Sequence, residues 1–140
     1  MFADAIHYRN GKSYDLLAFT IMPNHVHMVF SLLPKDDNSV GRLAESTRKV
    51  TIHRQFGRDS VPSYRVTQIL ESLKKYSALR ANRLLARTGA FWQQESYDHV
   101  IRNGEELERI IWYVLNNPVK AGFVDSWEKW PWTFCKKGLL

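Results

Sequence analysis

The chain has 140 residues, of which 44% are hydrophobic, and its formal net charge is +6. This length and composition predict one globular domain with a substantial core and argue against global disorder. No apolar run approaches the ~20 residues that a membrane-spanning helix needs, and the single cysteine, Cys135, excludes an intrachain disulfide and a four-cysteine zinc knuckle.

Two strands are predicted near the N-terminus, at residues 14–21 and 25–32, joined by the turn-forming residues Met22-Pro23-Asn24. Because side chains alternate along a strand, His25 and His27 point to one face and Val26 points to the other. Two imidazoles side by side on a strand form half of a metal site. The alternative is a strand whose open face is rich in histidine and binds no metal.

The middle of the chain is strongly basic. Helices are predicted from Ser39 to about residue 50 and from about Thr67 to Arg87, with a break at 57–63. Residues 42–87 contain eleven Lys and Arg but three Asp and Glu, a net charge of +8 that leaves −2 for the rest of the chain. Such a block is typical of a protein that binds nucleic acid, and the alternative is a solvated helix face.

The last predicted helix begins at Asn103, which has Glu106 three residues on, and ends at Asn117, before a proline. Its apolar stripe consists of Leu107, Ile110, Ile111 and Val114. At about 100° per residue, Tyr113 lies roughly 110° from the centre of that stripe and shares a face with Asn117. Tyr113 is therefore predicted to face a ligand; the alternative is a boundary tyrosine that packs against a neighbouring element.

Four motifs in this order resemble the single-tyrosine HUH transposases, and most of all their branch of REP-associated tyrosine transposases. They are MPNHVH (22–27), FWQ (91–93), YDHVIR (97–102) and YVLNNPVKAG (113–122). The resemblance implies an α+β fold: a ferredoxin-like antiparallel sheet with helices on one face. Family members usually begin with a further strand, so the chain is expected to be one transposase-like catalytic domain, 1–140, that lacks the first strand and is truncated at its N-terminus.

The resemblance also implies an activity: metal-dependent nicking and strand transfer of single-stranded DNA through a covalent 5′-phosphotyrosine. The nucleophile falls on Tyr113, and the ligands of Mg²⁺ or Mn²⁺ fall on His25, His27 and Asn117. Tyr97 is the second candidate nucleophile, whereas the nearby His99 is typical of a structural histidine. Two other functions stay open, namely a nucleic-acid-binding remnant without catalysis and a metal-dependent nuclease that uses water.

The expected partner is single-stranded DNA that contains a hairpin, with bases stacked on aromatic residues such as Tyr76 or Tyr97. No membrane partner is expected, the expected location is the cytoplasm in association with the nucleoid, and an unpaired strand edge would favour a homodimer. The residues predicted to contact DNA are the cations of the second helix and two cations that bracket the tyrosine helix: Lys74, Lys75, Arg80, Arg83, Arg87, Arg102 and Lys120.

Overall fold

The computed structural model describes residues 1–33, 64–93 and 99–140. Its three antiparallel strands have the order β2-β1-β3, with β1 (Tyr14–Ile21) between β2 (Val26–Leu32) and β3 (Thr133–Cys135). The other elements are the helices α1 (Phe2–Arg9), α2 (Tyr64–Leu84), α3 (Gly104–Leu115) and α4 (Asn117–Lys120) and the 3-10 turn η1 (Trp127–Lys129). The predicted α+β class with an antiparallel sheet is confirmed.

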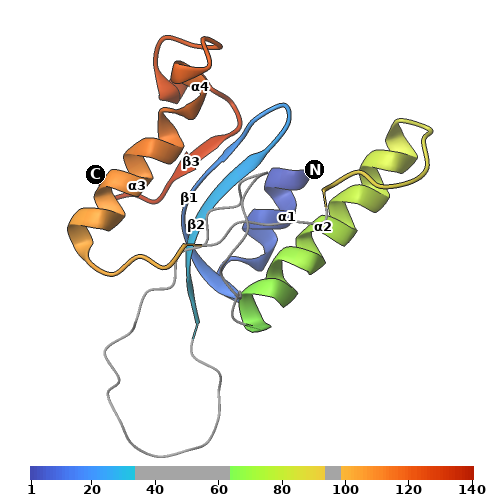
Figure 1. Cartoon of the computed structure of the whole chain (residues 1–140), viewed down its shortest axis with the longest axis horizontal. Coiled ribbons are helices and arrows are strands. Elements are labelled where there is room, and N and C mark those ends of the chain that lie inside the picture. Colours follow the sequence, from blue (N-terminus) through green and yellow to red (C-terminus); the bar gives the residue numbers. More distant parts are fainter. Residues whose placement is uncertain (34–63, 94–98) are drawn as a thin grey trace, which may run out of the picture.

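The two predicted strands form a hairpin. β1 has the predicted bounds, and β2 begins one residue later than predicted. Their register pairs Thr20 with His27 and Ile21 with Val26. The turn is closed by a 2.8 Å hydrogen bond from the Met22 N–H to the His25 carbonyl. Both histidines therefore lie at the turn end of the sheet, the end at which α4 also lies (Figure 1).

Helices cover both faces of the sheet, so the expectation that they lie on one face is wrong. In Figure 1, α1 and α2 lie on one side of the strands and α3 on the other. Phe19 packs with the α1 and α2 side, whereas Leu17, Ala18 and Val29 pack with α3. The register of β1 shifts between Leu16 and Ala18, as at a β-bulge. A nearly continuous apolar run is what a strand buried on both faces requires.

Tyr14 is a structural tyrosine. Its side chain is fully buried, and its hydroxyl donates a 2.7 Å hydrogen bond to the Ile6 carbonyl of α1. Burial raises the pKa of this phenol. The bond fixes α1 against the sheet and gives the buried hydroxyl the partner it needs.

Helix α2 begins and ends three residues earlier than predicted, and the chain then turns back along it. Asn82 Nδ2 donates to the Gly89 carbonyl at 2.8 Å, and Trp92 Nε1 donates to Ser77 Oγ at 2.8 Å. Trp92, from the FWQ motif, also packs against the core. The helix predicted from Ser39 and the break at 57–63 lie outside the described residues. Among the helices that the structure does describe, none combines the length and apolarity that a membrane crossing needs.

Candidate active site

Four side chains from three segments meet at the turn end of the sheet. His25 precedes β2, His27 lies on it, Tyr113 lies in the last turn of α3, and Asn117 begins α4. Asn117 Oδ1 lies 3.3 Å from His25 Nε2, and Asn117 Nδ2 lies 3.0 Å from His27 Nε2. The His27 ring centroid lies 4.7 Å from that of His25 and 5.5 Å from that of Tyr113. The structure thus brings together all the predicted nucleophile and metal residues, although their roles stay predictions.

Asn117 reaches this site from a separate helix. α3 ends at Leu115, and Asn117 and Pro118 open α4, so Tyr113 and Asn117 do not share one continuous helix as predicted. The helix ends two residues before the predicted Asn117, and Asn117 itself is helical because Pro118 occupies the first turn of α4, where a missing N–H leaves no bond unmade. Since only Asn116 separates the two helices, the amide still arrives beside the tyrosine.

His27 is fully buried, with 0% of its surface exposed, so its face of the strand is not open. Thr20, its partner in β1, is equally buried and shares a 2.8 Å hydrogen bond with Thr133 of β3. His25, by contrast, is half-buried. The cause is α3, which covers this face of the sheet. Replacing His27 therefore removes packing as well as a donor atom, which makes His25 the cleaner position for testing metal binding.

The donor atoms at the site fit a divalent ion. His25 Nδ1 lies 2.7 Å from Asn24 Oδ1, an oxygen that accepts hydrogen bonds. In the neutral ring this contact places the proton on Nδ1 and leaves the lone pair on Nε2, the atom that faces Asn117. Two imidazole nitrogens and one amide oxygen would hold an ion and would leave room for substrate oxygens. Within the described residues no three His, Cys, Asp or Glu gather at a possible metal site, and the third donor beside the two imidazoles is the amide of Asn117.

Lys120 is the predicted DNA-contacting residue that lies beside the tyrosine. Its ammonium nitrogen lies 5.1 Å from the centroid of the Tyr113 ring, at the distance of a cation–π contact. Lys120 is exposed and belongs to the last position of α4. The Tyr113 ring therefore contacts both a buried imidazole and an exposed positive charge.

The DNA-contacting residues predicted for the second helix lie in α2, except for Arg87, which follows its end; α2 lies on the other side of the sheet from α3, the helix of Tyr113 (Figure 1). Lys74 donates a 2.8 Å hydrogen bond to the Gln93 carbonyl, and burial lowers its pKa. Arg87 donates to the Ala90 carbonyl at 3.2 Å. Lys75 and Arg83 are exposed. A DNA strand that contacts both groups of cations would have to extend around the sheet.

Arg9 is a basic residue that the sequence analysis missed. Its guanidinium carbon and that of Arg80 each lie 5.6 Å from the centroid of the Tyr76 ring. Arg80 also donates to the Tyr76 hydroxyl at 2.9 Å, and Arg9 donates to Ser72 at 3.0 Å. Arg9 adds a cation from α1 to the basic surface of α2. Its spacing in the sequence gave no signal, because the contact depends on how α1 packs against α2.

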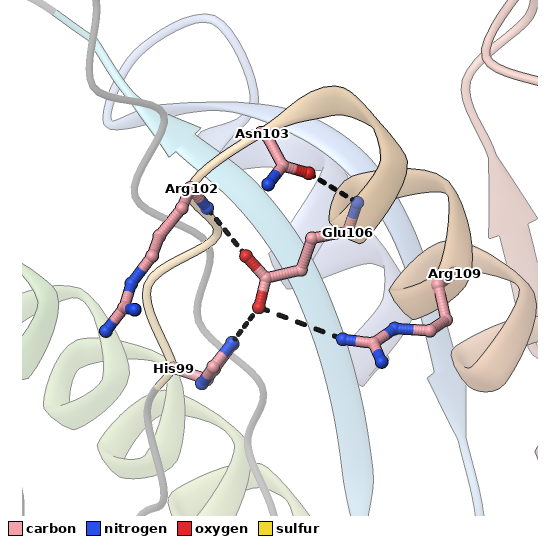
Figure 2. Close-up of polar contacts among 5 residues, drawn as sticks. All are labelled: His99, Arg102, Asn103, Glu106 and Arg109. Carbon is pink, nitrogen blue, oxygen red and sulfur yellow. Dashed lines mark hydrogen bonds and ion pairs between the residues drawn. The ribbon is translucent and has the colours of Figure 1, made fainter.

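A cluster of polar contacts around the Glu106 carboxylate fixes the start of α3 (Figure 2). Asn103 Oδ1 accepts from the Glu106 N–H at 2.8 Å, which confirms the predicted cap. Glu106 accepts from the Arg102 N–H at 2.8 Å and lies 2.8 Å from His99 Nε2. The Arg102 backbone bond, followed by the His99 bond, lowers the pKa of Glu106. His99 thus has the structural hydrogen bond expected of it, whereas Tyr97 lies outside the described residues.

The Arg102 side chain points away from the carboxylate in Figure 2, whereas Arg109 turns towards it, with Nη2 4.0 Å from Glu106 Oε1. Arg102 precedes α3 and Lys120 follows it, so the two cations do bracket the tyrosine helix as predicted. Only Lys120 contacts the ring of Tyr113 among these two. Contact of Arg102 with DNA stays a prediction.

Comparisons with known proteins agree with the motifs. No protein-family model matches the chain. A Haemophilus influenzae protein provisionally named a REP-associated tyrosine transposase is 28% identical over 121 residues, which cover 86% of this chain and 58% of that protein. The REP-associated tyrosine transposase of Escherichia coli K12 is 23% identical over 128 residues, which cover 91% of this chain and 58% of that protein.

A solved structure of a REP-associated tyrosine transposase bound to a REP hairpin is similar with a TM-score of 0.56 and 19% identity, covering 95% of this chain and 62% of the other. This likeness shows a common fold. The chain spans 58% of the length of each curated relative above. Similarity in sequence and fold thus confirms the resemblance read from the motifs: over most of its length, this chain is similar to REP-associated tyrosine transposases.

Proposed function

We propose that this chain nicks and rejoins single-stranded DNA, with Tyr113 as the nucleophile, as a metal-dependent transposase. The observation that carries the proposal is the convergence of Tyr113, His27 and Asn117, which lie up to 90 positions apart in the sequence. The names of the relatives support the same class of enzyme. Of the tyrosines whose side chains the structure describes, Tyr113 is the one with a ring contact to His27.

The proposed chemistry follows from what each side chain offers. Mg²⁺ or Mn²⁺ held by His25, His27 and Asn117 would polarise a non-bridging oxygen of the scissile phosphate. The Tyr113 hydroxyl gives its proton to water, and its oxygen attacks phosphorus and forms the phosphotyrosine bond while the bond from phosphorus to the 3′ oxygen breaks. The 3′ oxygen keeps the electron pair and takes up a proton to leave as a 3′-hydroxyl. Lys120 attracts the negative charge of the attacking phenolate.

The phosphotyrosine step conserves the energy of the phosphodiester bond. A 3′-hydroxyl from another DNA end can therefore attack the phosphotyrosine, release Tyr113 and join the two strands without ATP. We propose single-stranded DNA with a hairpin as the substrate, because the similar solved structure holds a REP hairpin. A cytoplasmic location with the nucleoid follows from such a substrate, and a homodimer stays a prediction.

The test of this function separates it from its two alternatives. An end-labelled hairpin oligonucleotide is incubated with the protein and Mn²⁺ and then denatured. A label that stays attached to the protein supports the phosphotyrosine. Cleavage without attachment would instead indicate a nuclease that uses water, and binding without cleavage would indicate a nucleic-acid-binding remnant.

Removing the half-buried histidine is expected to weaken metal binding with little effect on folding. His25→Ala should raise the Kd for Mn²⁺ by more than about 10-fold, because even a residue that only orients a ligand is worth 10–100-fold. Titration calorimetry measures this affinity, and a thermal melt checks the fold. His99→Ala is the matched control, since His99 contacts Glu106 at the start of α3. Unchanged Mn²⁺ affinity in His25→Ala would contradict the metal site.

Removing two exposed cations of α2 is expected to flatten the salt dependence of DNA binding. In the double variant Lys75→Ala and Arg83→Ala, the slope of log K against log salt should fall by about 0.7 for each lost contact to a single strand. Fluorescence anisotropy at several salt concentrations measures the slope. Replacing Lys136 and Lys137, which follow β3, is the charge-matched control. Equal slopes in the two double variants would mean that α2 presents a solvated face.

A further inference from the structure

Three aromatic side chains gather beside the candidate active site, and we call them the aromatic platform: Phe123, Trp130 and Trp132. Phe123 and Trp132 are each 51% exposed. The Phe123 and Trp130 rings are stacked, with centroids 5.2 Å apart and an interplanar angle of 26°. Single exposed apolar residues are common on proteins, whereas adjoining exposed rings form a contiguous apolar patch, which is typical of an interaction site.

The aromatic platform is fixed to the strand end that carries the histidines. Trp130 Nε1 donates to the Ile21 carbonyl at 2.9 Å, and the Ile21 N–H donates to the Trp132 carbonyl at 3.0 Å. Ile21 pairs with Val26, the residue between His25 and His27. β1 therefore lies between the backbone of the platform and the strand that carries the candidate metal ligands, and the platform backbone is hydrogen-bonded to β1.

A cleft of about 350 Å³ lies between the platform and the hairpin turn. Trp130 and Trp132 line it together with Met22 and Pro23, and the first residues of α1 close its other side. The cleft therefore lies on the α1 side of the sheet, and a DNA strand that reaches it from Tyr113 passes around the hairpin turn. The lining is mostly apolar. Because Met22 and Pro23 lead directly into Asn24 and His25, the cleft and the candidate active site share one turn of the chain.

We propose that the aromatic platform binds an unpaired nucleobase next to the scissile phosphate, an inference that rests on the proposed function. A DNA strand with a phosphate at Tyr113 would bring its neighbouring nucleotides past this turn. Base–aromatic stacking is available to an unpaired base of any sequence, and a base already stacked in a duplex cannot use it without unstacking. Lys120 supplies the adjoining positive charge that such strands need.

The ring of Tyr76, a stacking candidate from the sequence, is less suited to this role. Both Arg9 and Arg80 lie over it, so two guanidinium groups already contact the ring. The platform residues carried no signal in the sequence, because three aromatic residues near the C-terminus of a chain are as typical of a core as of a ligand site. Their exposure distinguishes the two.

The first experiment compares two DNA probes. One is a hairpin with unpaired nucleotides on both sides of its stem, and the other is the same hairpin with blunt ends. Trp132→Leu, which keeps an apolar side chain and removes the ring, should weaken binding of the flanked hairpin by about 10-fold, within the range for losing one stacked base. Affinity for the blunt hairpin should stay the same. Phe123→Leu is a second, independent variant in case Trp132→Leu folds poorly.

Trp112→Leu is the matched control, because Trp112 is 42% exposed on α3 and does not belong to the platform. It should bind both probes as the parent protein does. Thermal melts of all three variants separate folding from binding. If Trp132→Leu and Phe123→Leu lower the melting temperature but leave the affinity for the flanked hairpin unchanged, the rings serve packing and the inference is wrong.

The second experiment removes the base instead of the ring. Abasic nucleotides are placed one at a time in the unpaired flanks, and one position should weaken binding to the parent protein by about 10-fold. At that position Trp132→Leu should lose no further affinity, because both changes remove the same contact. If the loss from Trp132→Leu and the loss from the abasic nucleotide multiply at every position, the inference is wrong, while the proposed function is unaffected. If the parent protein neither binds the hairpin nor becomes attached to it, the proposed function fails and the inference fails with it.

Discussion

Replacing Tyr113 with phenylalanine is expected to abolish covalent attachment to single-stranded DNA, by a factor on the order of 10³ or more. The reason is that phenylalanine keeps the ring and removes only the attacking oxygen. The ring contacts with His27 and Lys120 can persist, so the fold should be kept. The affinity for hairpin DNA should change by less than about twofold. A large loss of attachment beside unchanged binding is the signature of a nucleophile.

The measurement uses end-labelled hairpin DNA with Mn²⁺, followed by denaturing electrophoresis and, separately, anisotropy for binding. Tyr76→Phe is the matched control, since the Tyr76 hydroxyl contacts Arg80 and lies on the other side of the sheet. Its attachment should equal that of the parent protein. The assignment is wrong if labelled protein persists in Tyr113→Phe, or if Tyr97→Phe is the variant that loses it.

The parts of the fold that the sequence predicted depend on local patterns. β1, β2 and the start of α3 were each encoded by neighbouring residues: a turn at Met22-Pro23-Asn24, alternation around His27, and a cap at Asn103. The site residues could be predicted for the same reason. His25 and His27 are two positions apart, and Tyr113 and Asn117 are four apart. Local periodicity could therefore group the residues of each pair before the contact between the two pairs was known.

The parts that were missed depend on contacts between distant segments. β3 has three residues, too few for a pattern of its own, and it exists because Thr133 to Cys135 pair with β1. The expectation of helices on one face came from the family resemblance, and it failed because β1 is an almost continuous apolar strand that is buried on both faces. The burial of His27 follows from the same helix, α3, on the second face.

These contacts also change how the site is understood. A histidine on an open face is easily removed, whereas His27 is enclosed and supports the ring of Tyr113. One imidazole is therefore part of the core and the other is half-buried at its edge. Such an arrangement holds the inner imidazole rigidly, and rigid support is what the proposed metal site needs to keep its ligands in place.

Val26→Asp is expected to have the largest effect on folding, a loss of more than about 4 kcal/mol in the free energy of unfolding. Val26 is 2% exposed and packs in the core formed with α1 and α2, on the face of β2 opposite His27. An unpaired carboxylate there would have no compensating partner. Because whole domains are stable by only about 5–15 kcal/mol, most molecules of this variant should be unfolded or melt far below the parent protein.

Val100→Asp is the matched control, because Val100 is 43% exposed and the same change there should alter stability by less than about 0.5 kcal/mol. Thermal and urea unfolding followed by circular dichroism measure both variants. The comparison also tests the site, since Val26 separates His25 from His27 along the chain. If Val26→Asp melts like Val100→Asp, Val26 faces solvent and the alternation of β2 is reversed. His25 and His27 would then no longer lie on the side of the sheet where α3 presents Tyr113, and the metal and nucleophile would have no common site.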